Sequence, residues 1–303
     1  CAYTYYTDVT GYLQTRMIYS DANWTTLVAT YIYYNDATGR LQSKRNSNGT
    51  IVTYYAGSAG NEIADYSYNY ILGTSIVEST SLYFYGSSMV RAASALTTDA
   101  MTKEAKYSGQ GSNPAQLISE TFYVGIKGSE IRDYSVNYAG ITVLGYSTYF
   151  YGTGVRASIA TINIPMCAVV ITKTSPASSL MPTPDTVSIT YYKNVVGLEQ
   201  SDYTIKYAGG AEVDRTYYFY NNARASTATI NVAMTASQTQ SGTVSITAIG
   251  ANAFTKSIKY YKNGVGNEQS DYAINYAGTT EVDRTYYFYG TARASAATIN
   301  VAM

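Results

Sequence analysis

Residues 188–234 read SITYYKNVVGLEQSDYTIKYAGGAEVDRTYYFYNNARASTATINVAM. Residues 257–303 read SIKYYKNGVGNEQSDYAINYAGTTEVDRTYYFYGTARASAATINVAM, which matches the first stretch at 37 of 47 positions with no gap and an offset of 69 in the numbering. Two more divergent copies lie upstream, with SEIRDYSVNYAG at 129–140 and NEIADYSYNY at 61–70. A repeat of this length indicates one supersecondary unit that recurs along the chain.

Two independent landmarks recur with nearly the same spacing. Four aromatic centres recur at intervals of 66, 69 and 69 in the numbering, namely Phe84, Phe150, Phe219 and Phe288. Four Asp-Tyr steps recur at intervals of 68, 69 and 69 and end at Tyr66, Tyr134, Tyr203 and Tyr272. Because the landmarks agree, the chain contains four copies of one unit, and the period of the last three is 69.

The local patterns within a repeat are typical of strands. SDYTIKYAG (201–209) alternates and stops at a glycine, and RTYYFYNN (215–222) is an aromatic run that ends in an Asn-Asn turn signal. ATINVAM (228–234) alternates with period two, and VSITAIG (244–250) also predicts a strand. The segment 98–107 is the place where a short helix is hardest to exclude. We predict an all-β fold of tandem repeats.

Three segments indicate linkers by their Gly, Pro, Ser and Gln content: 108–116, 175–184 and 235–242. We therefore divide the chain into N-terminal hairpins with a candidate donor segment (1–49) and four β repeats (50–116, 117–184, 185–253 and the incomplete 254–303). The repeats form either small β units packed in line, which the linkers favour, or one continuous wound sheet.

The composition favours half-buried sheet surfaces over charged ones. The chain has 36 Tyr and only 13% charged residues, about half the ~25% of ordinary soluble domains. Tyr packs its ring while its hydroxyl stays hydrogen-bonded. The 20 basic and 20 acidic residues cancel, so there is no electrostatic footprint for nucleic acid. A membrane-spanning helix needs an apolar run of about 18 residues or more, and because the sequence has none, no membrane span is expected.

The residues that most catalysis needs are missing. The chain has no His, so a Ser-His or Cys-His arrangement and an imidazole metal site are excluded. The two Cys lack C-x-x-C spacing, and there is no P-loop, dinucleotide fingerprint or calcium loop. Carboxylates recur once per repeat, as in Glu199 and Asp202, Glu268 and Asp271, and Glu130 and Asp133. A catalytic pair rarely recurs in this way, so we expect a non-enzymatic protein without cofactor or metal.

Charged and aromatic residues recur together after the aromatic strand. The recurring set comprises Tyr85, Tyr151, Tyr220 and Tyr289 with Arg91, Arg156, Arg224 and Arg293. We interpret this set as a Tyr/Arg ladder in which Arg anchors a turn or stacks on a Tyr face. The alternative is a repeated contact with a glycan or peptide. The step Asp214-Arg215 also recurs, as Asp283-Arg284.

The N-terminal segment carries a second, shorter repeat. Residues 5–16 read YYTDVTGYLQTR, and residues 33–44 read YYNDATGRLQSK. With the following RNSNGTIVTYYAG (45–57), this pattern resembles the YD repeat of Rhs-like proteins, clearly over about residues 5–57. The matching positions are Tyr34, Asp36, Gly39, Arg40, Leu41, Gly49 and Tyr54. The resemblance implies β-hairpins that wind into a large extracellular scaffold, as in toxin shells.

The chain ends suggest a way of joining copies. Met303 followed by the Cys1-Ala2 of another chain would recreate the internal junction Met166-Cys167-Ala168. We therefore hypothesise that residues 1–28, which include Tyr3 and Tyr5, add a strand to the last repeat of a neighbouring copy. The alternative is that the chain is trimmed from a longer array. Cys1 is also compatible with a lipid anchor, a disulfide or a processed end.

From these observations we predict that the chain is a structural subunit of an extracellular filament, sheath or surface appendage. We expect its partners to be other copies of the same chain. The first alternative is a surface-anchored adhesin or carbohydrate-binding stalk, and the second is a fragment of an Rhs-type shell. Asn23 (Asn-Trp-Thr) and Asn48 (Asn-Gly-Thr) match the glycosylation acceptor pattern.

Overall fold

The computed structural model describes residues 2–7, 13–19, 27–46, 48–266, 268–294 and 296. Nearly all ordered elements in these ranges are strands, and the two helices are single 3-10 turns, η1 (Ala92–Ser94) and η2 (Pro114–Gln116). The all-β prediction is confirmed, and the segment in which a helix was hardest to exclude contains a strand. The chain forms two compact units, Cys1–Leu144 and Gly145–Met303.

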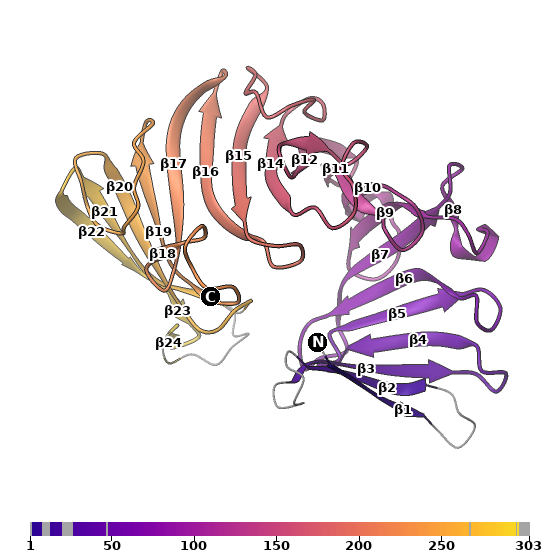
Figure 1. Cartoon of the computed structure of the whole chain (residues 1–303). Coiled ribbons are helices and arrows are strands. Elements are labelled where there is room, and N and C mark those ends of the chain that lie inside the picture. Colours follow the sequence, from indigo (N-terminus) through magenta and orange to yellow (C-terminus); the bar gives the residue numbers. More distant parts are fainter. Residues whose placement is uncertain are drawn as a thin grey trace. The chain divides into compact units, whose positions relative to one another are not determined.

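The first unit is an antiparallel meander (Figure 1). Its strands are β1 (Ala2–Thr7), β2 (Leu13–Tyr19), β3 (Leu27–Asn35), β4 (Leu41–Asn46), β5 (Ile51–Ala56), β6 (Ile63–Tyr70), β7 (Val77–Tyr85), β8 (Val90–Arg91), β9 (Met101–Ser108), β10 (Leu117–Val124) and β11 (Ile131–Ala139). Each long strand from β1 to β7 pairs with the next, and β7 pairs with β9, β9 with β10 and β10 with β11.

The second unit continues the same pattern. Its strands are β12 (Thr142–Tyr151, which begins in the first unit), β13 (Val155–Arg156), β14 (Met166–Thr172), β15 (Thr186–Lys193), β16 (Gln200–Ala208), β17 (Ala211–Tyr220), β18 (Ala223–Arg224), β19 (Met234–Ser241), β20 (Thr255–Lys262), β21 (Gln269–Ala277), β22 (Thr280–Tyr286), β23 (Phe288–Tyr289) and β24 (Ala292–Arg293). The pairings run β12–β14–β15–β16–β17–β19–β20–β21–β22, all antiparallel.

One repeat consists of four long strands and a two-residue return strand. In the third repeat these are β15, β16, β17 and β19, and β18 folds back on the end of β17. The expected boundaries after residues 116, 184 and 253 fall in the loops between paired strands β9–β10, β14–β15 and β19–β20. Within each unit, one repeat therefore runs into the next through the hydrogen-bonded ladder.

The turns follow from residues that accept a left-handed backbone. Asn221 and Asn222 have φ of 49° and 67°, so the predicted Asn-Asn turn between β17 and β18 has positive φ at both positions. Gly125 has φ of 131°, and a Cβ there would lie 2.5 Å from the carbonyl oxygen of Ser129. Glycine is required at Gly125 because the two arms of the β10–β11 hairpin approach so closely.

Each unit has its core on the aromatic third strand. In the second unit, Phe219 packs with Tyr217 and Ala236, and in the first unit Tyr85 packs with Ile63 and Ala92. Loops cover the core in place of a second sheet. Ile246 and Ile249 from the loop after β19 pack on Phe219 and its neighbours, and Ala177 and Leu180 from the loop after β14 pack on Phe150 and Ile189.

Three local predictions are wrong, and the covering loop after β19 explains two of them. Residues 228–233 and 244–250 were expected to be strands but are loops, and residues 235–242 were expected to be a linker but form most of β19. The polar β19 is central because its fully buried Gln238 bonds the covering loop. The Gln238 side chain donates to the carbonyl of Gly250 at 2.6 Å and accepts from the Gly250 N–H at 2.9 Å. The apolar residues that alternate in 244–250 belong instead to a loop, in which Ile246 and Ile249 pack on the core.

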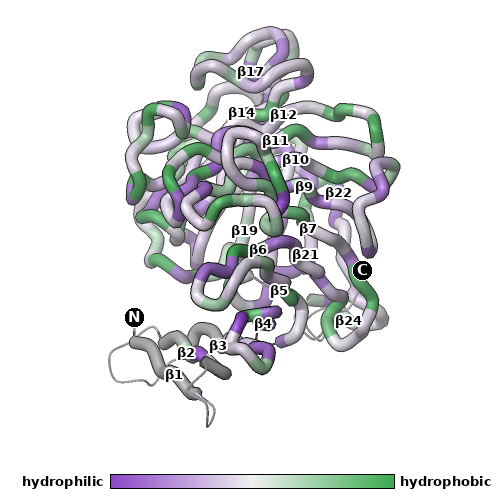
Figure 2. The backbone as a smooth tube through the Cα atoms, turned by 90° about the vertical axis from the view of Figure 1, so that its right-hand side faces the viewer, coloured by the Kyte–Doolittle hydropathy of each residue, from purple (hydrophilic) through white to green (hydrophobic). Residues whose placement is uncertain are grey.

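Aromatic pairs and hydroxyl pairs lie on opposite faces of the sheet. Tyr191 and Tyr203 stack across β15 and β16 with ring centroids 4.6 Å apart. At the next position, the hydroxyls of Thr190 and Thr204 lie 2.8 Å apart. Neighbouring side chains on a strand point to opposite faces, so the two pairs line different sides. Figure 2 shows the consequence, since hydrophobic and hydrophilic residues are interspersed along the tube.

We predict that Phe219→Ala destabilises the second unit by about 3–5 kcal/mol, because it opens a cavity at a fully buried ring. The matched control is Phe254→Ala, since Phe254 lies in a loop with 49% of its surface exposed and is expected to change stability by about 0.5 kcal/mol or less. Native-state hydrogen exchange of the β16, β17 and β19 amides measures both. Equal effects of the two substitutions would contradict this assignment of the core.

Candidate functional site

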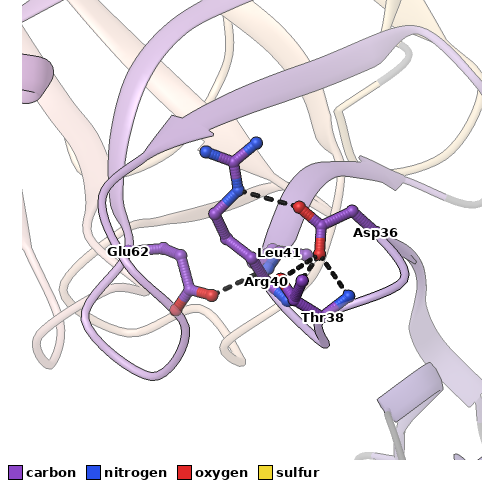
Figure 3. Close-up of polar contacts among 5 residues, drawn as sticks. All are labelled: Asp36, Thr38, Arg40, Leu41 and Glu62. Atoms are coloured by element: carbon purple, nitrogen blue, oxygen red, sulfur yellow. Dashed lines mark hydrogen bonds and ion pairs between the residues drawn. The ribbon is translucent and has the colours of Figure 1, made fainter.

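The YD motif forms a tight turn between β3 and β4 (Figure 3). One carboxylate oxygen of Asp36 accepts from the Thr38 N–H at 2.9 Å, the Thr38 hydroxyl at 2.6 Å and the Arg40 N–H at 3.1 Å. The other carboxylate oxygen accepts from Nε of Arg40 at 3.0 Å. These donors, led by the Thr38 hydroxyl, hold the pKa of Asp36 at about 2, below its ordinary 3.8. Asp36 and Arg40 therefore fix the turn itself.

The recurring Arg residues bind an Asp two strands away. Arg91 pairs with Asp65 at 2.8 Å, Arg224 with Asp202 at 2.8 Å, and Arg293 with Asp271 at 2.9 Å. We call each such pair a clamp. It joins the return strand after the third strand to the second strand of the same repeat. Asp202 and Asp271 are buried, but the Arg224 side chain is 12% exposed and that of Arg293 is 36% exposed, so the Asp202–Arg224 pair is the better shielded from solvent.

The covering loop and the aromatic core complete the clamp of the third repeat. The Arg224 guanidinium also donates to the carbonyl of Ile246 at 2.7 Å, and its central carbon lies 4.4 Å from the ring centre of Tyr217. Arg293 lies over Tyr286 at 4.6 Å in the same way. Arg156 donates to the carbonyl of Ala177 at 2.8 Å, which is the equivalent covering loop one repeat earlier. Arg thus connects the sheet to the loop that covers its core.

The ladder Tyr residues anchor the second strand through their hydroxyls. Tyr220 donates to the carbonyl of Ser201 at 3.0 Å, and Tyr85 donates to the carbonyl of Ala64. Burial raises the pKa of Tyr220 to about 12. Tyr151 is buried and Tyr289 is half-buried. In the first and third repeats, the ladder Tyr therefore anchors the backbone of the second strand.

The aromatic stacks involve residues that sequence reasoning did not single out as a site. The stacked pairs are Tyr54 with Tyr66, Phe122 with Tyr134, Tyr191 with Tyr203, and Tyr260 with Tyr272, with centroid distances of 4.6, 4.6, 4.6 and 4.5 Å. The second member of each pair ends an Asp-Tyr step, and the first precedes it by the same interval in every repeat. That constant offset between two β-rich aromatic positions is the signal that would have identified the stacks.

A recurring Glu fixes where each fourth strand begins. The Glu carboxylate accepts a backbone N–H from the first residue of a strand in the neighbouring repeat, and we call this contact a pin. The pins are Glu62 to Leu41 at 2.8 Å, Glu130 to Met101 at 3.0 Å, Glu199 to Met166 at 3.1 Å and Glu268 to Met234 at 3.2 Å. Figure 3 shows the first of them beside the YD turn. The recurring carboxylates are thus engaged in separate contacts, Glu in a pin and Asp in a clamp.

The Asp and the Arg of the recurring Asp-Arg step bind different partners. Arg215 forms an ion pair with Glu212 at 2.6 Å, and Arg284 with Glu281 at 2.5 Å. Asp214 pairs with Lys256 of the next repeat. The hydrogen bonds from Arg215 to Glu212 raise the pKa of the guanidinium.

The residues of the assembly hypothesis are partly described. Cys1 and Met303 lie outside the described residues, as does the glycosylation candidate Asn23. Ala2, Tyr3 and Tyr5 belong to β1, which pairs with β2, and β2 pairs with β3 of the same chain. Residues 13–19 therefore have both edges occupied within their own chain.

The remaining candidates have ordinary surroundings. Cys167 is a free, half-buried cysteine in β14, and burial raises the pKa of its thiol. Asn48 lies exposed in the β4–β5 turn, where its side chain accepts from the N–H and hydroxyl of Thr50. Within the described ranges, no cluster of three acidic, His or Cys side chains has the arrangement of metal ligands. The helices in these ranges are too short and polar to span a bilayer.

No model of a known protein family matches the chain, and no curated protein matches it. Among solved structures, it is similar to a crystal structure of TcdB2-TccC3, with 15% identity, 94% of this chain and 17% of that chain covered, and a TM-score of 0.24. A crystal structure of TcdB2-TccC3-TEV shares 12% sequence identity, and the match covers 89% of this chain and 16% of that chain, with a TM-score of 0.25. A structure of the Photorhabdus luminescens Tc holotoxin pore shares 9% sequence identity with this chain. The match covers 94% of this chain and 18% of that chain, with a TM-score of 0.18. The chain spans less than a fifth of the length of each.

We predict that Glu199→Ala speeds exchange of the Met166 amide hydrogen by about tenfold or more, because the N–H loses its acceptor at the start of β14. Glu199→Gln is the matched control, since its amide oxygen retains an acceptor and its exchange is expected to stay near wild type. Amide exchange followed by NMR measures both. If Gln and Ala behave alike, the pin does not act through that hydrogen bond.

We predict that the Asp36 carboxyl titrates at about 2 in the folded chain. Because this pKa is lowered on folding, the stabilisation of the turn is present above the ordinary value of 3.8 and is lost as the pH falls through about 2. The carboxyl carbon resonance of Asp36 reports the midpoint, and Asp36→Asn is expected to remove this part of the acid dependence. A midpoint near 3.8 would contradict the network of Figure 3.

Proposed function

We propose that this chain is a section of an Rhs-type β-sheet scaffold whose role is structural. The observation that carries the proposal is the clamp, in which the repeat places its Asp and Arg against each other and against the covering loop. In the third repeat, Arg224 contacts Asp202, Tyr217 and the Ile246 carbonyl together. Residues that bind a ligand need free donors or acceptors, whereas these are directed at the protein itself.

We propose that the protein is not an enzyme, for a related reason. The carboxylates that recur in a pair are committed to different partners, Glu199 to a backbone N–H and Asp202 to Arg224. A general acid or base needs a proton-transfer path to a substrate, and the same pair recurs as Glu268 and Asp271 with the same partners. Their repetition supports a role in holding register.

The proposed scaffold is extracellular or exposed at a cell surface. The YD motif supports this location, because its matching residues Tyr34, Asp36, Arg40 and Leu41 form a hairpin turn pinned to the next repeat by Glu62. A Tyr-rich sheet with few charges suits a long wall, because each stacked pair adds about 0.5–1.5 kcal/mol without a charged side chain.

A filament subunit is a second proposal, and one observation favours it. Among the described residues, β22 pairs with β21 alone, and a strand edge of this kind is a surface to which a further strand can be added. The adhesin or glycan-binding stalk has less support. The ring faces that would bind sugars are largely taken up by stacking on one another or by Arg.

Cryo-electron microscopy of the protein as its native source produces it tests the scaffold proposal. We expect residues 48–139 and residues 145–266 each to form part of a continuous sheet, with the covering loops and clamps of each unit packed against its own strands. Binding of the purified chain to a glycan array tests the alternative that the protein is a glycan-binding stalk. Saturable binding to one glycan, lost on substitution of an exposed Tyr such as Tyr34 and retained with Phe254→Ala, would contradict the scaffold as the main role.

A further inference from the structure

The stacked tyrosines face each other at one fixed place in the strand ladder. Tyr191 of β15 and Tyr203 of β16 are direct partners in the register, and their rings lie with centroids 4.6 Å apart and planes 21° apart. Two other pairs of direct partners stack in the same way, with planes 15° and 20° apart, namely Tyr54 with Tyr66 and Tyr260 with Tyr272. Each of these stacks therefore holds two phenol rings face to face across adjacent strands.

The second repeat has the same stack with one phenol missing. Phe122 takes the place of the first tyrosine and stacks on Tyr134, with centroids 4.6 Å apart and planes 16° apart. Packing therefore does not by itself require a hydroxyl on both rings of the other stacks. Among the described residues, the hydroxyls of Tyr191 and Tyr203 have no protein partner, whereas that of Tyr220 anchors a backbone carbonyl. The phenols of this stack are thus chemically available.

The rings of the Tyr–Tyr stacks are also within reach of a small molecule. All of these tyrosines are half-buried. In contrast, Tyr217 is only 1% exposed and donates its hydroxyl hydrogen bond to the carbonyl of Val244. In the last repeat, a cavity of about 300 Å³ is lined by both stacked rings, Tyr260 and Tyr272, and by Lys262. A small oxidant in that cavity lies against the two phenols at once.

We propose that the three Tyr–Tyr stacks are sites of oxidative coupling to dityrosine. A one-electron oxidant removes one electron and one proton from each phenol, and the two phenoxyl radicals form a carbon–carbon bond between the ring positions next to their oxygens. The hydrogen on each joined carbon then moves to the oxygen of its own ring. Two electrons have passed to two equivalents of the oxidant and two protons to water.

The fold favours this coupling over coupling between separate chains. A reaction between two groups that are already held together avoids the entropic cost of bringing them together, which is a large part of a bimolecular barrier. The product is a covalent bond between adjacent strands of one hairpin, such as β15 and β16. The inference concerns the chemistry of the stacks and does not rest on the scaffold role.

Light-driven oxidation of the whole chain by a ruthenium tris-bipyridyl complex with persulfate tests the proposal. Dilute protein keeps the chains apart, and proteolysis followed by mass spectrometry identifies which tyrosines are joined. Phe122→Tyr completes the fourth stack opposite Tyr134, with Phe254→Tyr as its matched control because Phe254 lies in a loop and is 49% exposed. Tyr191→Phe removes one phenol and keeps the ring, and circular dichroism verifies that each variant is folded.

We expect dityrosine at the three stacked pairs of the folded wild type, each at least about tenfold more abundant than in the same chain unfolded in urea. Phe122→Tyr is expected to gain a bond to Tyr134, Phe254→Tyr to gain none, and Tyr191→Phe to lose only the bond to Tyr203. A folded wild type whose crosslinks are scattered as in the unfolded chain would overturn the proposal. A folded Phe122→Tyr variant without a bond to Tyr134 would overturn it as well.

Discussion

The buried ion pair between Asp202 and Arg224 is the constraint on which each repeat depends. Removing a carboxylate from water is unfavourable unless it is paired and hydrogen-bonded. Here the pairing holds the return strand, the second strand, the ring of Tyr217 and the covering loop in one arrangement. The same ion pair recurs in the first repeat as Arg91 with Asp65 and in the last as Arg293 with Asp271. Each Glu pin then binds the first N–H of the fourth strand in the preceding repeat. The pins therefore fix the register between one repeat and the next.

This arrangement explains how a chain with few charges forms a long sheet without a second sheet to cover it. The loops after β14 and β19 bring Leu180 and Ile246 onto the aromatic strands, while Tyr hydroxyls and Thr pairs satisfy the polar groups. The charged side chains of the clamps form ion pairs within a repeat, and those of the pins accept backbone hydrogen bonds between repeats.

The sequence predicts the strands that carry the repeat signature, because alternation and turn residues act locally. β16, β17 and the Asn-Asn turn lie where the patterns place them. β19 could not be predicted from its own residues, because MTASQTQS becomes a strand only when Gln238 bonds the covering loop. Residues 244–250 alternate like a strand, yet their apolar side chains pack down on the core as a loop. Likewise, the recurrence of Arg224 predicts that it anchors a turn or stacks on a Tyr face. Its ion pair with Asp202, 22 residues away in the sequence, depends on the way the strands between them fold.

A double-mutant cycle on Asp202→Asn and Arg224→Met measures the central interaction most directly, with the exposed pair Asp36→Asn and Arg40→Met as reference. The account predicts that the two substitutions in the buried clamp are coupled by more than about 1 kcal/mol in the stability of the second unit. The reference pair is expected to be coupled by less than about 1 kcal/mol. Additive effects at Asp202 and Arg224, with a coupling no larger than that of the surface pair, would contradict the claim that the clamp holds the repeat together.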